Sequence, residues 1–262
     1  MTTVQDILDL IQTFAPLETA EEWDNVGLLV GRRGKTVRKV LVALDPFPAV
    51  IDEAETWGAD LILVHHPLMF SLKRVTDDDV LGRSVRQLIA SDMAEISLHT
   101  NLDRAQGGVN DCLARAIGLQ NIGFLTVDGV DRNGREYGYG RVGEVPEQPL
   151  ENYAQKVKAA LGCEAVRVFD AGRSVRRVAV GSGSSAKFAA DAAAAGCDTY
   201  VTGDEKYSNF QEARDLGLNV IDAGHFYTEN VVCPALVERL TAAFPALEVR
   251  ISRRHRDLIR FL

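Results

Sequence analysis

The residues best suited to chemistry are histidines that follow apolar segments. The chain has five histidines, and four of them come directly after stretches with the composition of buried strands. His65 and His66 follow the aliphatic run Leu61–Val64, and His99 and His225 follow two other such segments. Ligands bind beyond the carboxyl ends of strands in open α/β sheets. We therefore expect these imidazoles to gather in a functional site.

Two carboxylates occupy the same kind of position. Asp103 comes soon after His99, and Glu229 follows His225 by four residues. A helix is expected over 228–244, and if it begins early, at residue 225, His225 and Glu229 share one of its faces. Imidazoles combined with carboxylates suit Zn, Mn, Fe or Ni, whereas Mg and Ca prefer oxygen ligands. The pattern predicts a site for divalent metal ions.

The adjacent pair His65 and His66 leaves the number of ions open. On an extended backbone the two rings would point to opposite sides. Each could then serve a different ion, or one could be a ligand while the other supports it. The alternative without function is a pair of loop histidines in partial contact with water. No compact metal motif such as H-E-x-x-H is present to decide among these readings.

The elements that must position these residues alternate between strand and helix. The pattern predicts strands over 37–44 and 61–64 and from residue 94, with helices over 48–57 and 80–91 between them. Turn signals increase near residue 128, after which a second α/β region follows. We expect a two-lobed α/β protein with mostly parallel sheets covered by helices. The first lobe would span 1–127, and the second, interlinked with it or separate, 128–262.

Composition excludes several classes of protein. The chain has 262 residues, 46% of them apolar, and a net charge of −8 that disfavours broad nucleic-acid binding. No apolar run is long enough to cross a membrane, and the first residues lack the basic region of a signal peptide. The four cysteines are scattered without C-x-x-C spacing, which indicates reduced thiols. We expect a cytoplasmic protein.

Weaker signals lie outside the histidine pattern. The segment Gly181–Ser185 follows a predicted strand and could bind a phosphate through its amides, although a tight turn explains it as well. Arg104 and Lys206 lie near predicted strand ends, where they could meet an anionic substrate or simply be solvated. The run Arg253–Arg256, which contains His255, indicates a charged edge.

Several short motifs, spread over the chain from residue 22 to residue 229, resemble the Nif-three-like family. Members of that family are commonly labelled GTP cyclohydrolase 1 type 2 homologue. The motifs are Glu22–Leu28, Val64–Leu68, Thr100–Asp103, Gly108–Asp111, Thr202–Asp204, and Asp222–His225 with Glu229. They stand in the family's order, and the chain resembles the short form without a central insertion.

The resemblance implies a Nif-three-like fold with two metal ions between two lobes. Its ligands would be His65, His66, Asp103, His225 and Glu229, with Glu229 as the bridging carboxylate. The resemblance also implies a homohexamer shaped as a ring.

A centre of this kind predicts a metal-dependent hydrolase that uses an activated water. The substrate would be a small molecule, with a nucleotide as one candidate and opening of the GTP imidazole ring as the specific version. His99 is our candidate for proton transfer, with a purely structural hydrogen bond as its alternative. Asp24, Asn25, Asp204 and Asp222 are candidates to orient imidazoles or substrate.

A second functional class is compatible with the same residues. The metal site could belong to a non-enzymatic scaffold or to a regulatory interaction protein. A catalytic site keeps a coordination position for water, whereas a structural site is closed. Five protein ligands shared by two ions leave positions open, which favours catalysis.

Overall fold

The chain folds into two compact α/β units. The structure is a computed structural model that describes residues 1–262. The first unit comprises residues 1–102 and 233–256, and the second comprises 103–232 and 257–262. The division predicted at residue 128 falls inside the second unit, and the chain returns to the first unit for its last strand.

The first unit is built on a five-stranded sheet with the strand order β1-β4-β3-β2-β13. Strands β4, β3, β2 and β13 are parallel to one another, and β1 runs antiparallel at one edge. The strands are β1 (Gly27–Val30), β2 (Lys39–Ala43), β3 (Leu61–Val64), β4 (Ala94–Ser97) and β13 (Glu248–Ile251); the helices are α1 (Val4–Phe14), η1 (Leu17–Thr19), α2 (Pro48–Trp57), α3 (Val80–Ala90) and α10 (Val232–Ala243).

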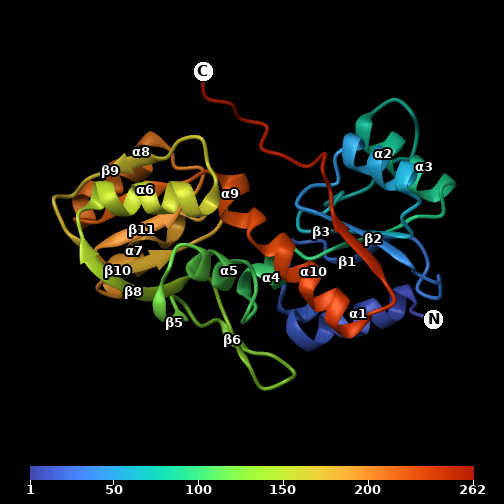
Figure 1. Ribbon diagram of the computed structural model, residues 1–262, viewed down its shortest axis with the longest axis horizontal. Coiled ribbons are helices and arrows are strands. Elements are labelled where there is room, and N and C mark those ends of the chain that lie inside the picture. Colours follow the sequence, from blue (N-terminus) through green and yellow to red (C-terminus); the bar gives the residue numbers. More distant parts are fainter. The chain divides into compact units, whose positions relative to one another are not determined.

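Helices cover both faces of this sheet (Figure 1). Side chains of α2 and α3 pack against β2 and β3 in one core, while α1 and α10 lie on the other side, where Arg239 stacks on Phe14. Every residue of β3 is buried, as its uniform aliphatic composition predicts. Burial of each such side chain stabilises the fold by about 1.5–3 kcal/mol relative to exposure.

The register of the parallel strands brings their carboxyl ends to one edge. Ala43 of β2 pairs with Val64 of β3, and Val64 pairs with Ser97 of β4. The residues that follow these strands therefore leave the sheet side by side. This edge places His65 and His66 beside the segment that contains His99.

The second unit contains a six-stranded sheet with the order β5-β8-β10-β11-β12-β9 and a separate two-stranded ribbon, β6-β7. Only β10, β11 and β12 at its centre are parallel. The strands are β5 (Gln120–Phe124), β6 (Gly129–Val130), β7 (Glu136–Tyr137), β8 (Arg141–Gln148), β9 (Arg167–Phe169), β10 (Val175–Val180), β11 (Thr199–Thr202) and β12 (Asn219–Asp222). The helices are α4 (Thr100–Arg104), which begins in the first unit, α5 (Val109–Ala116), α6 (Leu150–Leu161), η2 (Ala186–Phe188), α7 (Ala189–Ala194), α8 (Tyr207–Leu216) and α9 (His225–Asn230).

Two apolar cores hold this second sheet between helices. One joins α5 and α6 to β10, β11 and β12, and the other joins α7 and α8 to the opposite face. Beside them lies the buried ion pair of Arg141 with Asp111, in which Arg141 also donates to three backbone carbonyls. Because removal of one partner would leave an uncompensated buried charge, this pair fixes the position of α5 against β8.

Two predicted elements differ in detail from those in the structure. The strand expected from residue 94 ends at Ser97, so Asp103 lies on the short helix α4 and not on a strand end. The helix expected over 228–244 is divided into α9 and α10, and α9 begins at His225. His225 and Glu229 are therefore one helical turn apart, the arrangement that their spacing predicts.

The helices and the cysteines can be compared with what the composition predicts. None of the helices combines the length and the apolar character needed to cross a membrane. All four cysteines are free thiols, and Cys163, Cys197 and Cys233 are buried.

Glu95 is the one acidic residue within a strand of the first sheet's interior. It is fully buried in β4, opposite Ile62 of β3, and neither carboxyl oxygen makes a hydrogen bond of normal geometry. Burial raises the pKa of this carboxyl to about 8, against a smaller lowering by the nearby Leu68 amide. Glu95 is thus neutral in the folded protein at pH 7.

We predict that Glu95 makes the stability of the protein fall as pH rises. The unfolded chain ionises this group near 4.5 and the folded chain only near 8. The contribution of Glu95 to stability is therefore complete below pH 4.5 and is lost between these values, by up to about 1.4 kcal/mol per pH unit. Urea unfolding from pH 5 to 8 should show this slope in the wild type and a reduced slope in Glu95→Gln. The exposed Glu147→Gln is the control, and an equal slope in all three proteins would contradict the prediction.

Candidate metal centre

Three predicted histidines of the first unit form a cluster. One ring nitrogen from each of His65, His66 and His99 lies within 4.8 Å of the other two. The ring centroids are 4.9 Å apart for His65 and His66, and 5.3 and 5.6 Å from these two to His99. His65 is fully buried, and the other two are half-buried. This spacing would let the three imidazoles share a cation or serve neighbouring ones.

The backbone brings His65 and His66 to the same side. Their two amides both donate to the carbonyl of Leu44, at 3.2 and 2.9 Å. The chain therefore bends at once after β3, and the alternation of an extended strand is lost. This explains why the rings lie together and do not point to opposite sides, as an extended backbone would require.

A hydrogen bond from Nδ1 fixes each of these rings. His65 Nδ1 lies 2.7 Å from the Leu98 carbonyl, His66 Nδ1 lies 2.7 Å from Asp45 Oδ1, and His99 Nδ1 lies 2.9 Å from Asp24 Oδ1. Carbonyl and carboxylate oxygens only accept hydrogen bonds, so each Nδ1 carries the proton. The lone pair of each neutral ring is then on Nε2, the state that a metal ligand requires.

The carboxylate of Asp24 accepts several hydrogen bonds besides the one from His99. It accepts bonds from His99, from the Thr100 amide and from the Thr100 hydroxyl. Burial alone would raise the pKa of Asp24, but the bonds from His99 and Thr100 outweigh it and lower the pKa to about 2. Asp24 is therefore ionised at any physiological pH and holds His99 in one tautomer.

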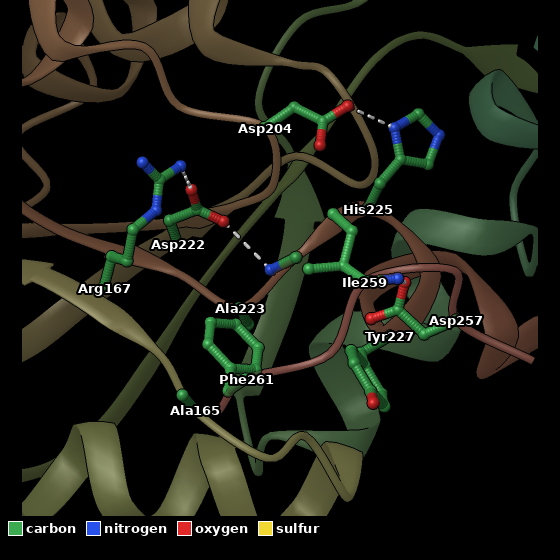
Figure 2. A pocket seen from close by; sticks show the side chains of 11 residues that line it. Ala165, Arg167, Asp204, Asp222, Ala223, His225, Tyr227, Asp257, Ile259 and Phe261 are labelled. Carbon is green, nitrogen blue, oxygen red and sulfur yellow. Dashed lines mark hydrogen bonds and ion pairs between the residues drawn. The ribbon is translucent and has the colours of Figure 1, made fainter.

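The second unit supplies a similar group. His225 Nδ1 donates to Asp204 Oδ2 at 2.7 Å, and His225 Nε2 lies 3.0 Å from Glu229 Oε2 (Figure 2 shows the Asp204 bond). A carboxylate oxygen of Asp103 lies within 4.8 Å of one from Glu229. Thr202 of β11 pairs with Asp222 of β12, so Asp204 and His225 also follow adjacent strand ends.

The charges around His225 favour a cation. Burial would lower the pKa of His225, but its hydrogen bonds and charge interactions with Glu229 and Asp204 raise it to about 9. The two carboxylates that contact the His225 ring stabilise a positive charge there, and either a proton or a divalent ion can supply that charge. Metal and proton would compete for Nε2, so metal affinity at this place should weaken as pH falls.

The glycine-rich segment serves this group as a tight turn. The Ser182 amide donates to Asn110 Oδ1 and the Gly183 amide to the Thr228 hydroxyl, so protein groups take both amides. Gly183 has φ +59°, and a Cβ there would lie 2.0 Å from Glu229 Oε1. Only glycine allows the chain to pass so close to Glu229.

The remaining predicted site residues form hydrogen bonds with backbone groups of the loops around the two groups of ligands. Asn25 donates to the Met69 carbonyl at 2.7 Å and so supports the loop after His66. Asp222 accepts from the amides of Glu205 and Gly224 and pairs with Arg167, which fixes the loop before His225 (Figure 2). Lys206 is exposed at the start of α8, where its amide donates to Asn209.

Asp45 is a functional candidate that the sequence reasoning missed. It follows β2 directly and binds the His66 ring, but in the sequence it precedes Pro46 and resembles an ordinary turn residue. The available signal was its place after a strand that neighbours β3, the same signal that identified the histidines. The Leu98 carbonyl could not have been found, because a backbone acceptor has no signature in the sequence.

A cavity of about 240 Å³ adjoins the second group (Figure 2). It is lined by Arg167 on β9, by the loop that ends at His225, and by Tyr227, Ile259 and Phe261. Most of its wall is apolar, with Arg167 as its cationic residue. It offers space for part of a small molecule next to His225.

The donor chemistry of both groups fits borderline divalent metal ions. The first unit offers three imidazoles, and the second offers one imidazole and two carboxylates. Supported imidazole ligands with carboxylates are typical of Zn, Mn, Fe and Ni sites. The residues present could therefore hold such ions.

A family model, sequence relatives and solved structures are all similar to this chain over almost its whole length. The family model described as Duf34/NIF3 (NGG1p interacting factor 3) matches residues 2–257. A protein of Clostridium perfringens named GTP cyclohydrolase 1 type 2 homolog is 35% identical over 99% of both chains. The crystal structure of a Bacillus cereus protein related to NIF3 has a TM-score of 0.89 at 27% identity, over 100% of this chain and 99% of that one. Reduced HcgD from Methanocaldococcus jannaschii has a TM-score of 0.81 at 32% identity, over 97% and 98%.

Asp45→Asn should weaken metal binding. The substitution removes the charge that holds the Nδ1 proton of His66 and supports its Nε2 as a donor. Loss of such a support lowers metal affinity by about 10-fold to 100-fold. Titration of Zn²⁺ against a chromophoric chelator measures this, with Asp52→Asn, an aspartate on α2 bonded to Gln87, as control. Equal affinities in the two variants would show that Asp45 has no part in the site.

Proposed function

Because the chain belongs to the Duf34/NIF3 family, we propose that it is a metal-dependent hydrolase with the ligands His65, His66, Asp103, His225 and Glu229. The observation that supports this most is the fixed tautomer of its histidines. Each proposed imidazole ligand has an oxygen acceptor on Nδ1, so Nε2 is the nitrogen left for a metal ion, which at His225 would replace a proton. Histidines kept only for packing do not require this arrangement.

We further propose that these five ligands hold two ions, with Glu229 as the bridging carboxylate. The support for this step is chemical. Three imidazoles and two carboxylates suit borderline divalent ions, and a carboxylate can bind two ions through its two oxygens. The expected ions are Zn, Mn, Fe or Ni.

The proposed reaction is hydrolysis. When bound, the ions would supply a water of lowered pKa and an electrophilic contact for a substrate oxygen. The role that we assign to His99 is proton transfer. Asp24 is held ionised by its low pKa and keeps the proton on His99 Nδ1, so Nε2 is the atom that takes up and releases a proton.

Two exposed aromatic residues beside His99 suggest a flat substrate. Trp23 and Phe70 are 62% and 56% exposed, and each ring lies about 6 Å from the His99 ring in an edge-on contact. Exposed aromatic faces next to a reactive group can stack a planar ring. A purine would fit this chemistry, and opening of the GTP imidazole ring is the specific reaction that we propose to test. The name of the Clostridium relative supports the choice of GTP.

The proposal extends to assembly and location. We propose a ring-shaped homohexamer in the cytoplasm. The basis is the family resemblance, together with free thiols that suit a reducing compartment.

We predict metal-dependent turnover that depends on His99 separately from metal binding. Protein loaded with Zn²⁺ or Mn²⁺ would be assayed with GTP and with a panel of phosphoesters, amides and cyclic amidines. For the substrate that is turned over, His99→Gln should lower kcat by about 100-fold to 10,000-fold while metal content stays unchanged. His66→Ala serves as the metal-deficient control.

Two results would contradict this proposal. Fully loaded wild type that turns over GTP no faster than His66→Ala would exclude the GTP reaction. The same result over the whole panel would oppose a hydrolase. Loss of metal from His99→Gln would instead identify His99 as a ligand and remove its proton-transfer role.

A further inference from the structure

The arginine-rich segment near the C-terminus belongs to the first unit and has no part in the proposed reaction. Residues 250–256 contain four arginines and no acidic residue, in a chain whose net charge is −8. They comprise the end of β13 and the turn that follows it. In an acidic protein, such a concentration of positive charge needs a structural or functional reason.

The backbone of this turn is held rigidly. Glu53 of α2 accepts from the Ser252 hydroxyl at 2.6 Å and from the amides of Arg253 and Arg254 at 3.0 and 3.1 Å. Burial would raise the pKa of Glu53, but these bonds lower it, so the carboxylate is ionised and committed to the turn. His255 Nδ1 accepts from the Leu44 amide and anchors the other end. The arginine side chains therefore leave a backbone whose conformation is fixed before any ligand binds.

A cavity of about 540 Å³ lies between this turn and α2. Arg250, Arg253 and Arg254 line one side, and α2 lines the other with Asp52, Glu53, Thr56 and Trp57. The Arg250 guanidinium stacks on Trp57 at 4.2 Å from the ring centroid. Arg253 and Arg254 are exposed, and neither makes a salt bridge. The guanidinium groups of Arg253 and Arg254 are therefore exposed and available to a ligand.

Two carboxylates of the lining, Asp52 and Glu53, offset part of this charge but do not exceed it. Glu53 uses both oxygens on the turn, and Asp52 accepts from the Gln87 side chain. Lys39 adds a further cation near Trp57, 5.3 Å from its ring centroid. Guanidinium groups recognise phosphate through paired, charge-assisted hydrogen bonds. The fixed turn reduces the entropy lost when they do so.

We propose that this cavity binds a small molecule with at least two linked phosphate groups, such as a nucleoside diphosphate. Three guanidinium groups, with Lys39 nearby, exceed the charge of Asp52 and Glu53, and their N–H donors can serve two linked phosphate groups at once. A nucleic-acid strand fits less well, because the net negative charge of the protein repels an extended polyanion. The site is separate from the histidines, so it can be present or absent whatever reaction they perform.

The two tryptophans of the chain allow a local test. In the full-length Trp23→Phe protein, fluorescence reports Trp57 alone. ADP and inorganic pyrophosphate should each give a saturable change, and adenosine should give none. In the same background, Arg253→Gln/Arg254→Gln should weaken ADP binding by at least about 10-fold, because each lost charge-assisted hydrogen bond contributes about that factor. The matched control is Arg83→Gln/Arg86→Gln, which removes the same charge from exposed positions of α3 and should bind like the parent.

Three outcomes would overturn the proposal. These are the absence of a saturable change with ADP at millimolar concentration, an equal response to adenosine, and equal weakening in the control variant. A Trp57→Phe protein, which keeps Trp23, shows whether ADP binds near His99 instead. A response confined to that protein would assign the phosphate to the histidine site, and would also overturn the proposal. None of these outcomes alters the metal content on which the proposed hydrolase depends.

Discussion

The candidate site depends on one interaction, the hydrogen bond that each imidazole donates from Nδ1 to an oxygen. Asp45, Asp24 and Asp204 accept three of these bonds, and the Leu98 carbonyl accepts the fourth. Each bond selects a tautomer, orients a ring and leaves Nε2 as the donor atom. Without it, a histidine after a strand is a side chain with several rotamers and two tautomers, and a precise ligand set could not form.

The fold provides these acceptors because parallel strands end together. In the first unit, β2 carries Asp45 next to the pair that follows β3, and β4 leads to His99. In the second unit, β11 carries Asp204 next to the histidine that follows β12. Both units thus use the same physical arrangement, in which the supporting carboxylate comes from the strand adjacent to the one that carries its imidazole. The glycine at position 183 adds a steric requirement, since no side chain would fit beside Glu229.

Much of the fold and of the site could be predicted from patterns with a clear period or position. The uniform aliphatic run predicted β3, the helix expected over 48–57 corresponds to α2, and the histidines indicated the edge of the sheet where the candidate site lies. The contact of Asp24 with His99 and that of Asp204 with His225 match the proposed orienting roles. Orientation after a strand could not be predicted, because it is set by backbone bonds such as those to Leu44. Nor could the sequence show that residues 233–256 return to the first unit, since that depends on contacts far apart along the chain.

The central proposal is that His65, His66, Asp103, His225 and Glu229 hold two divalent ions. Elemental analysis of metal per chain, after reconstitution and removal of excess metal, tests it most directly in the wild type, His66→Ala and His225→Ala. The account predicts two ions per chain in the wild type and a loss in each variant, because each removes a proposed ligand. Wild type without bound metal, or either variant with the metal content of the wild type, would contradict the account.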